Sequence, residues 1–309
     1  MTISSGPFTY DWQADWADIP VSPAHAHHGL AVLPDGNILT GHAAEPKCIL
    51  LTPEGKIIRE FAVPTRGTHG LTCSMEDGRV VVWITDVEDP QVVKTNLDGQ
   101  LLARLTKADF PLGDDTPFCP TATAVDPVTG EVWVTDGYGS HTVHCFTPDL
   151  VHKLQLDDEK GLGAFENPHG VFVDRRRDQS RIYVADRVNN RVQVFNPDGS
   201  FSHGIEEGLH TPSVFDTFGE YLVIGELEAR IHILDREDRI VATLGDGRQH
   251  VEKPGWPNRL DADGNPASPL DDIPEGELNS PHGVCADEHG NIYISEWLIG
   301  DRYTKLARV

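Results

Sequence analysis

The sequence is poor in cysteine, and its five cysteines are scattered. They stand at unrelated spacings in a chain of 309 residues, and no two of them form a CxxC pair. An odd number of dispersed cysteines in a chain of this size indicates reduced, mostly buried thiols, although one pair could still approach in space. We therefore expect free thiols and a cytoplasmic protein.

Basic residues and long apolar runs are also scarce. The 25 Lys and Arg stand against 49 Asp and Glu, which gives a formal net charge of −24. This charge argues against binding the phosphates of nucleic acids and against docking on anionic membranes. No apolar stretch approaches the roughly 20 residues of a membrane helix. The first residues lack the basic and apolar regions of a signal peptide.

What the chain does contain is a repeated segment. One copy, over residues 167–195, reads NPHGVFVDRRRDQSRIYVADRVNNRVQVF, and apolar residues such as Val171 and Val173 alternate with other residues in it. A period of two predicts short strands joined by turns. Related segments begin at His28, His69, Thr121, His169, Pro212 and His282. Copies spaced by roughly 40 to 50 residues, each with about four strands, are typical of a β-propeller.

The six copies predict an all-β chain that folds as one six-bladed β-propeller domain over residues 1–309. Residues 245–280 are rich in Pro, Gly and Asp, and we expect a long loop there between the fifth and sixth blades. This loop is either a lid over one face or a solvated insertion. The aromatic segment FTYDWQADW, residues 8–16, is expected to complete the last blade.

Histidine occupies the first position of the repeat in alternate copies, as His69, His169 and His282. In a six-bladed ring these three would lie roughly 120° apart and point toward one axis. Three neutral imidazoles with one open position form a catalytic transition-metal site. Alternatively, the histidines belong to a structural consensus and bond to a neighbouring blade. His28 and His42 could join the site or pack beside it, and the other histidines are assigned no role.

Several motifs together carry a family resemblance. They are FCPT at 118–121, VTDGY at 134–138, PH at 168–169, VADRVNNRVQVF at 184–195 and PH at 281–282. The repeats resemble NHL repeats. From about Gly67 to its end, the chain more specifically resembles the peptidyl-α-hydroxyglycine α-amidating lyases.

The resemblance implies a zinc-dependent lyase that cleaves a C–N or related bond of a small hydroxylated or peptide-like substrate. It implies that His69, His169 and His282 bind the zinc, that Tyr138 is catalytic and that Arg187 lies in the active site. Physical arguments allow these roles, since a phenol near a dication ionises more easily and a guanidinium can hold a carboxylate. Otherwise Tyr138 packs as a loop aromatic and Arg187 forms a salt bridge.

Three positions depart from the family pattern. The family's second active-site Arg is Ala43 here, and an Asp that helps to hold a structural calcium is Gly283. Calcium is therefore much less expected than zinc. Cys119 matches one half of a family disulfide, whose other half falls at Gly139. The missing disulfide fits a cytoplasmic relative, and the missing Arg leaves the exact substrate open.

Two other classes of protein compete with a lyase. A six-bladed lactonase-like hydrolase holds calcium with carboxylates, and would show Glu, Asn and Asp where this chain has histidine. A non-catalytic NHL propeller that binds a protein or ligand needs no histidines on alternate blades. It often carries a basic face, whereas this chain is acidic.

Overall fold

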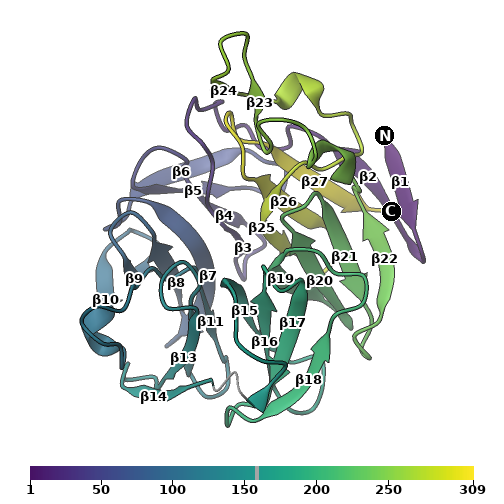
Figure 1. Cartoon of the computed structure of the whole chain (residues 1–309). Helices are drawn as coiled ribbons and strands as arrows, with labels where there is room; N and C mark the ends of the chain where they lie inside the picture. Colours follow the sequence, from purple (N-terminus) through teal and green to yellow (C-terminus); the bar gives the residue numbers. More distant parts are fainter. Residues whose placement is uncertain (157–159) are drawn as a thin grey trace. The chain divides into compact units, whose positions relative to one another are not determined.

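The protein has the predicted all-β fold, with six blades of a β-propeller and almost no helix. The computed structural model describes residues 1–156 and 160–309. Its strands form five four-stranded sheets, one five-stranded sheet and one two-stranded sheet (Figure 1). Within the described ranges, helix is limited to short 3-10 turns.

Each of the first five blades runs through its strands in chain order from one edge to the other. The first blade contains β3 (Leu30–Val32), β4 (Ile38–Gly41), β5 (Lys47–Leu51) and β6 (Ile57–Ala62). The second contains β7 (Thr68–Glu76), β8 (Arg79–Asp86), β9 (Gln91–Asn96) and β10 (Leu101–Leu105). The third contains β11 (Ala122–Val125), β12 (Val132–Asp136), β13 (Thr142–Phe146) and β14 (His152–Gln155).

The fourth and fifth blades follow the same order, whereas the sixth takes its outer strands from the N-terminus. The fourth contains β15 (Pro168–Asp174), β16 (Arg181–Asp186), β17 (Arg191–Phe195) and β18 (Phe201–Ile205). The fifth contains β19 (Pro212–Phe218), β20 (Tyr221–Glu226), β21 (Arg230–Leu234) and β22 (Ile240–Leu244). The sixth contains β25 (Pro281–Ala286), β26 (Ile292–Glu296), β27 (Tyr303–Arg308) and two strands from the N-terminus, β2 (Phe8–Gln13) and β1 (Thr2–Ser5).

The N-terminal aromatic segment completes the last blade, as predicted. Strand β2 pairs antiparallel with β27, so that Tyr10 lies opposite Arg308. Tyr10 and Trp12 are buried on this strand. Their burial explains why an N-terminal segment with alternating aromatic residues adds to a sheet formed by the end of the chain.

The connection between the fifth and sixth blades is long, as expected, but it is not without structure. It contains the turns η3 (Arg248–His250) and η4 (Leu270–Asp272) and the hairpin of β23 (Arg259–Leu260) and β24 (Pro266–Ala267).

Two compact units can be distinguished, and each is described by itself. Unit 1 comprises Met1–Glu45, Ile49–Glu60 and Phe215–Val309, and unit 2 comprises Pro46–Cys48 and Phe61–Val214. The assignment of the chain to a single domain stays a prediction.

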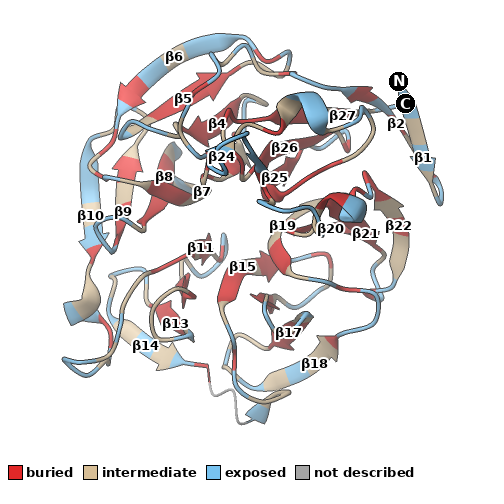
Figure 2. Ribbon diagram, turned by 45° about the horizontal axis from the view of Figure 1, so that its top comes forward, coloured by how far each residue is buried: buried red, intermediate tan, exposed pale blue. Residues whose placement is uncertain are grey.

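Apolar side chains are buried between the faces of neighbouring blades. In unit 2, Trp133 and Val143 of the third blade form one cluster with Val171 and Ile182 of the fourth. The outermost strands are more exposed, as Figure 2 shows for β6 and β10. The third and fourth blades therefore stack through their inner strands, and this stacking fixes the first strands of these two blades.

All five cysteines lie in the described part of the chain and are free thiols, three of them buried. Among the described residues, no helix combines the length and the apolar character that crossing a membrane requires.

Candidate metal and catalytic site

The three histidines predicted as ligands stand at irregularities of β-strand pairing. In the second blade, Thr68 pairs with Asp86 and Leu71 with Ile84, so that His69 and Gly70 together oppose a single residue. The same register shift spans His169 in the fourth blade and His282 in the sixth. A β-bulge of this kind re-aims a side chain and is common beside active sites.

The glycine after each histidine is required by a close backbone contact. A Cβ on Gly70 would lie 2.4 Å from the carbonyl oxygen of Thr121, and one on Gly170 would lie 2.4 Å from that of Ser213. At Gly283 the added atom would meet Ser295 Oγ at 2.4 Å. No side chain fits at these distances, which explains the repeated His-Gly motif.

The same two carbonyl oxygens orient the imidazoles of unit 2. The Nδ1 of His69 lies 2.7 Å from the Thr121 oxygen, and the Nδ1 of His169 lies 3.0 Å from the Ser213 oxygen. Because a carbonyl oxygen only accepts hydrogen bonds, each Nδ1 carries the proton and donates it. Each neutral ring then presents the lone pair of Nε2, which is the usual arrangement of a metal-binding histidine.

Tyr138 lies between these two imidazoles. Its hydroxyl oxygen is 3.3 Å from Nε2 of His69 and 3.2 Å from Nε2 of His169. A single phenolic hydrogen can bond to only one of these nitrogens at a time. The two rings, whose centroids are 5.0 Å apart, therefore direct both lone pairs toward one hydroxyl group.

Arg187 completes this group of unit 2. Its guanidinium carbon lies 5.5 Å from the centroid of the Tyr138 ring, within the range of a cation–π contact. Burial raises the pKa of Tyr138, and the charge and hydrogen bond of Arg187 lower it in part. The structure thus brings together four of the five residues predicted for the site, namely His69, Tyr138, His169 and Arg187.

An acidic residue at the end of the second strand fixes the loop that leads into the site strand. Asp86 accepts hydrogen bonds from the backbone N–H groups of Arg66 and Gly67, at 2.7 and 2.9 Å. Asp186 accepts from the N–H of Glu166 at 2.8 Å. Glu296 accepts from the N–H groups at positions 279 and 280, at 2.5 and 3.0 Å. These carboxylates hold the backbone two or three residues before His69, His169 and His282.

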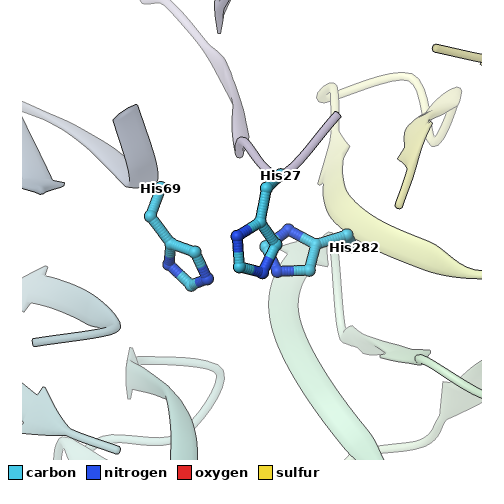
Figure 3. Close-up of side chains that lie close together, drawn as sticks. All are labelled: His27, His69 and His282. Carbon is cyan, nitrogen blue, oxygen red and sulfur yellow. The ribbon is translucent and has the colours of Figure 1, made fainter. Parts of the chain in front are cut away.

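His282, the fifth predicted residue, belongs to unit 1 and contacts His27. The centroids of the two rings lie 4.6 Å apart, with 49° between their planes. Figure 3 shows these two side chains next to each other and also draws His69 of unit 2. His27 has no predicted role, and its place in the HAHH segment is the sequence signal that singles it out.

His28 and His42 have structural partners. The Nε2 of His28 lies 2.7 Å from the hydroxyl oxygen of Tyr303. The Nδ1 of His42 accepts hydrogen bonds from the N–H groups of Ala44 and Glu45, at 3.1 and 3.0 Å. His42 therefore stabilises the turn after β4.

The position that the resemblance assigns to a disulfide partner does lie beside Cys119. A Cβ on Gly139 would be 2.4 Å from the backbone nitrogen of Cys119. The chain thus keeps the geometry of this loop while it lacks the second cysteine.

Together, the sheets and their order define a six-bladed β-propeller. Residues 119–146 match the family model of the NHL repeat. These residues cover β11, β12 and β13 of the third blade and include Thr121 and Tyr138.

Among known proteins, the chain is similar to amidating enzymes, as the motifs predicted. It is 33% identical over 199 residues to peptidyl-glycine alpha-amidating monooxygenase A of Xenopus laevis, covering 62% of this chain and 20% of that protein. It is 30% identical over 202 residues to a probable peptidyl-alpha-hydroxyglycine alpha-amidating lyase of Caenorhabditis elegans, covering 63% and 53%. NHL repeat-containing protein 3 of Mus musculus is 28% identical over 208 residues, covering 61% and 58%.

This chain therefore spans a fifth or less of the Xenopus relatives and about half of the worm protein. A solved structure described as a streptogramin B lyase has the same fold, with a TM-score of 0.63 and 16% identity. The likeness covers 97% of this chain and 98% of that one.

Proposed function

We propose that this protein is a zinc-dependent lyase that breaks the C–N bond of a hydroxylated, peptide-like substrate into an amide and an aldehyde. One observation carries the proposal: two imidazoles with fixed tautomers direct Nε2 at the hydroxyl of Tyr138, at 3.3 and 3.2 Å. The similarity to amidating enzymes supports this reaction over others.

The proposed zinc ligands are His69 and His169 of unit 2 and His282 of unit 1. All three side chains are buried, and neutral imidazole nitrogen is a donor that zinc prefers. The carbonyl oxygens that bind Nδ1 of His69 and His169 leave Nε2 as the ligand atom, so these residues fit the metal. Zinc held by three histidines supplies a Lewis acid that lowers the pKa of a hydroxyl group at its open position.

In this proposal, Tyr138 moves the proton of the reaction. As a phenolate, it takes the proton from the substrate hydroxyl, and the C–O bond becomes the carbonyl of the aldehyde. The C–N bond breaks, and its electron pair passes to nitrogen. The phenol then gives the same proton to that nitrogen, so that amide and aldehyde form without another reactant.

Arg187 binds the carboxylate of the substrate and lowers the pKa of Tyr138. A guanidinium pairs with a carboxylate through two parallel hydrogen bonds, which would orient the scissile bond relative to the phenol. Its position over the Tyr138 ring, 5.5 Å from the centroid, supports this assignment.

A non-catalytic NHL binding module is the second candidate function. The similarity to NHL repeat-containing protein 3 over 61% of the chain favours it. Such a protein has no need for two histidines with the same tautomer beside one phenol, and for this reason we prefer the lyase.

Metal content tests the proposal. We expect about one zinc per chain in the purified protein, retained in the control His289→Ala, which changes an exposed turn residue, and lost in His169→Ala. The measurement is elemental analysis after dialysis, with circular dichroism to verify folding. A wild-type protein without zinc would contradict the lyase, and calcium alone would indicate the hydrolase class.

A further inference from the structure

Aromatic rings gather beside His282 in unit 1. The ring of Trp297 stacks on that of His25, with centroids 5.0 Å apart and 11° between the planes. It lies 6.0 Å from the ring of His27 and meets Trp256 edge-on at 6.0 Å. The centroid of the His27 ring is 4.6 Å from that of His282. The rings of Trp256, Trp297 and His27 therefore form a continuous series from the 245–280 connection to His282, a proposed zinc ligand.

Hydrogen bonds fix both tryptophans to the segment that enters β25. The N–H of Trp297 donates to the carbonyl oxygen of Ser280 at 2.8 Å, and Ser280 Oγ donates to the Trp297 oxygen at 2.8 Å. The indole N–H of Trp256 donates to the carbonyl oxygen of Asn279 at 3.1 Å. The backbone of Trp297 and the ring of Trp256 are thus held by residues that lie two or three positions before His282, and the Trp297 ring is held by its stacking on His25.

These two tryptophans differ from the others in exposure. The chain has six tryptophans, and four of them, Trp12, Trp16, Trp83 and Trp133, are buried. Trp256 and Trp297 are only partly buried, and His25 beside them is exposed. Large rings that are rigidly held but incompletely covered offer an apolar surface to a ligand.

We propose that Trp297, Trp256 and His25, here called the aromatic wall, bind the side chain of the residue that precedes the scissile C–N bond. The inference rests on the proposed function, in which the reacting carbon is held beside His282. A group one residue away then lies within reach of Trp297. Aromatic rings attract each other beyond the effect of their buried area, so the substrate class is an α-hydroxyglycine preceded by an aromatic residue.

Paired substrates test the aromatic wall. We expect N-acetyl-phenylalanyl-α-hydroxyglycine to exceed N-acetyl-glycyl-α-hydroxyglycine in kcat/KM by about tenfold in wild-type protein. Trp297→Leu removes this preference by raising KM of the aromatic substrate toward that of the glycyl substrate. Trp297→Phe, which keeps a ring, retains it. The control Tyr221→Leu changes a partly buried aromatic residue that packs on Phe8 and also retains it.

The proposed role of the aromatic wall would be overturned if the preference for the phenylalanyl substrate persisted in Trp297→Leu or were absent from the wild type. Failure of both substrates to react would contradict the proposed function instead. In that case calorimetry with the two product amides, N-acetyl-phenylalaninamide and N-acetyl-glycinamide, decides the matter. Tighter binding of the first amide that Trp297→Leu abolishes supports the aromatic wall, and equal binding of both overturns it.

Discussion

Two pairs of imidazole and phenol groups in this protein share their chemistry and differ in their surroundings. In unit 1, Nε2 of His28 lies 2.7 Å from the hydroxyl of Tyr303, and both residues are buried. In unit 2, two imidazoles share the hydroxyl of Tyr138 at 3.3 and 3.2 Å, with Arg187 over the ring. His28 and His69 occupy the same position of the repeat.

The comparison shows that the repeat position alone does not make a functional histidine. Burial lowers the pKa of His28 to about 3 and raises that of Tyr303, so neither group changes its charge near neutral pH. Burial also raises the pKa of Tyr138, but the charge and hydrogen bond of Arg187 lower it in part, and two Nε2 atoms face its hydroxyl. The first pair therefore stabilises the fold, whereas the second pair has the partners that a proton-transfer group would need.

The strongest contrast is expected from removing each phenolic hydroxyl. Tyr138→Phe should lower the turnover of a hydroxyglycine substrate by about 10²- to 10⁴-fold, because a proton-transfer group is lost, while zinc remains bound. Tyr303→Phe should leave turnover unchanged and cost about 1 to 2 kcal/mol of unfolding free energy, since it removes the buried hydroxyl that hydrogen-bonds to His28 and Thr40. Steady-state kinetics and denaturant titration measure the two effects. Wild-type turnover in Tyr138→Phe would remove the distinction between the pairs.

The dependence of the unfolding free energy on pH should show that His28 is buried as a neutral imidazole. Because its folded-state pKa, about 3, lies below the ordinary value of 6.5, the unfolded chain binds more protons between these values. The stability that neutral His28 contributes is present above pH 6.5 and is lost as pH falls toward 3. Between pH 7 and 4 the loss should be about 3 kcal/mol, and His28→Gln should not show it. Parallel curves of unfolding free energy against pH would refute this assignment.

Changing a carboxylate that positions the site should have a smaller effect. Asp186 holds the N–H of Glu166 and pairs with Arg191 at 2.6 Å. Asp186→Asn should weaken zinc binding by about 10- to 100-fold, because the backbone before His169 loses its support.

Glu226→Gln is the matched control for this change. Glu226 is a buried acid at the end of β20 that pairs with Arg230, in a blade whose first position is Pro212. We expect it to lower stability without changing zinc affinity. Zinc competition titrations compare the two variants, and an equal effect of both would assign Asp186 a purely structural role.

Much of the fold follows from local patterns. Alternation as in Val171 and Val173 specifies strands, and the repeated segments specify blades, because a period of two and a turn are properties of neighbouring residues. The 245–280 connection and the added N-terminal strand could be predicted for the same reason. The repeat pattern placed Tyr138 and Arg187 one or two residues past the Asp that ends a second strand, where the structure has them, and the resemblance to amidating lyases singled them out.

What the sequence determined by itself is the kind of strand, the number of blades and which residues stand first in each repeat. Only the tertiary structure decided which of those residues are oriented for chemistry. The bonds that set the tautomers of His69 and His169 join residues 52 and 44 positions apart. Such contacts between blades depend on how sheets stack, and no local pattern encodes the carbonyl oxygen that a histidine ring will meet.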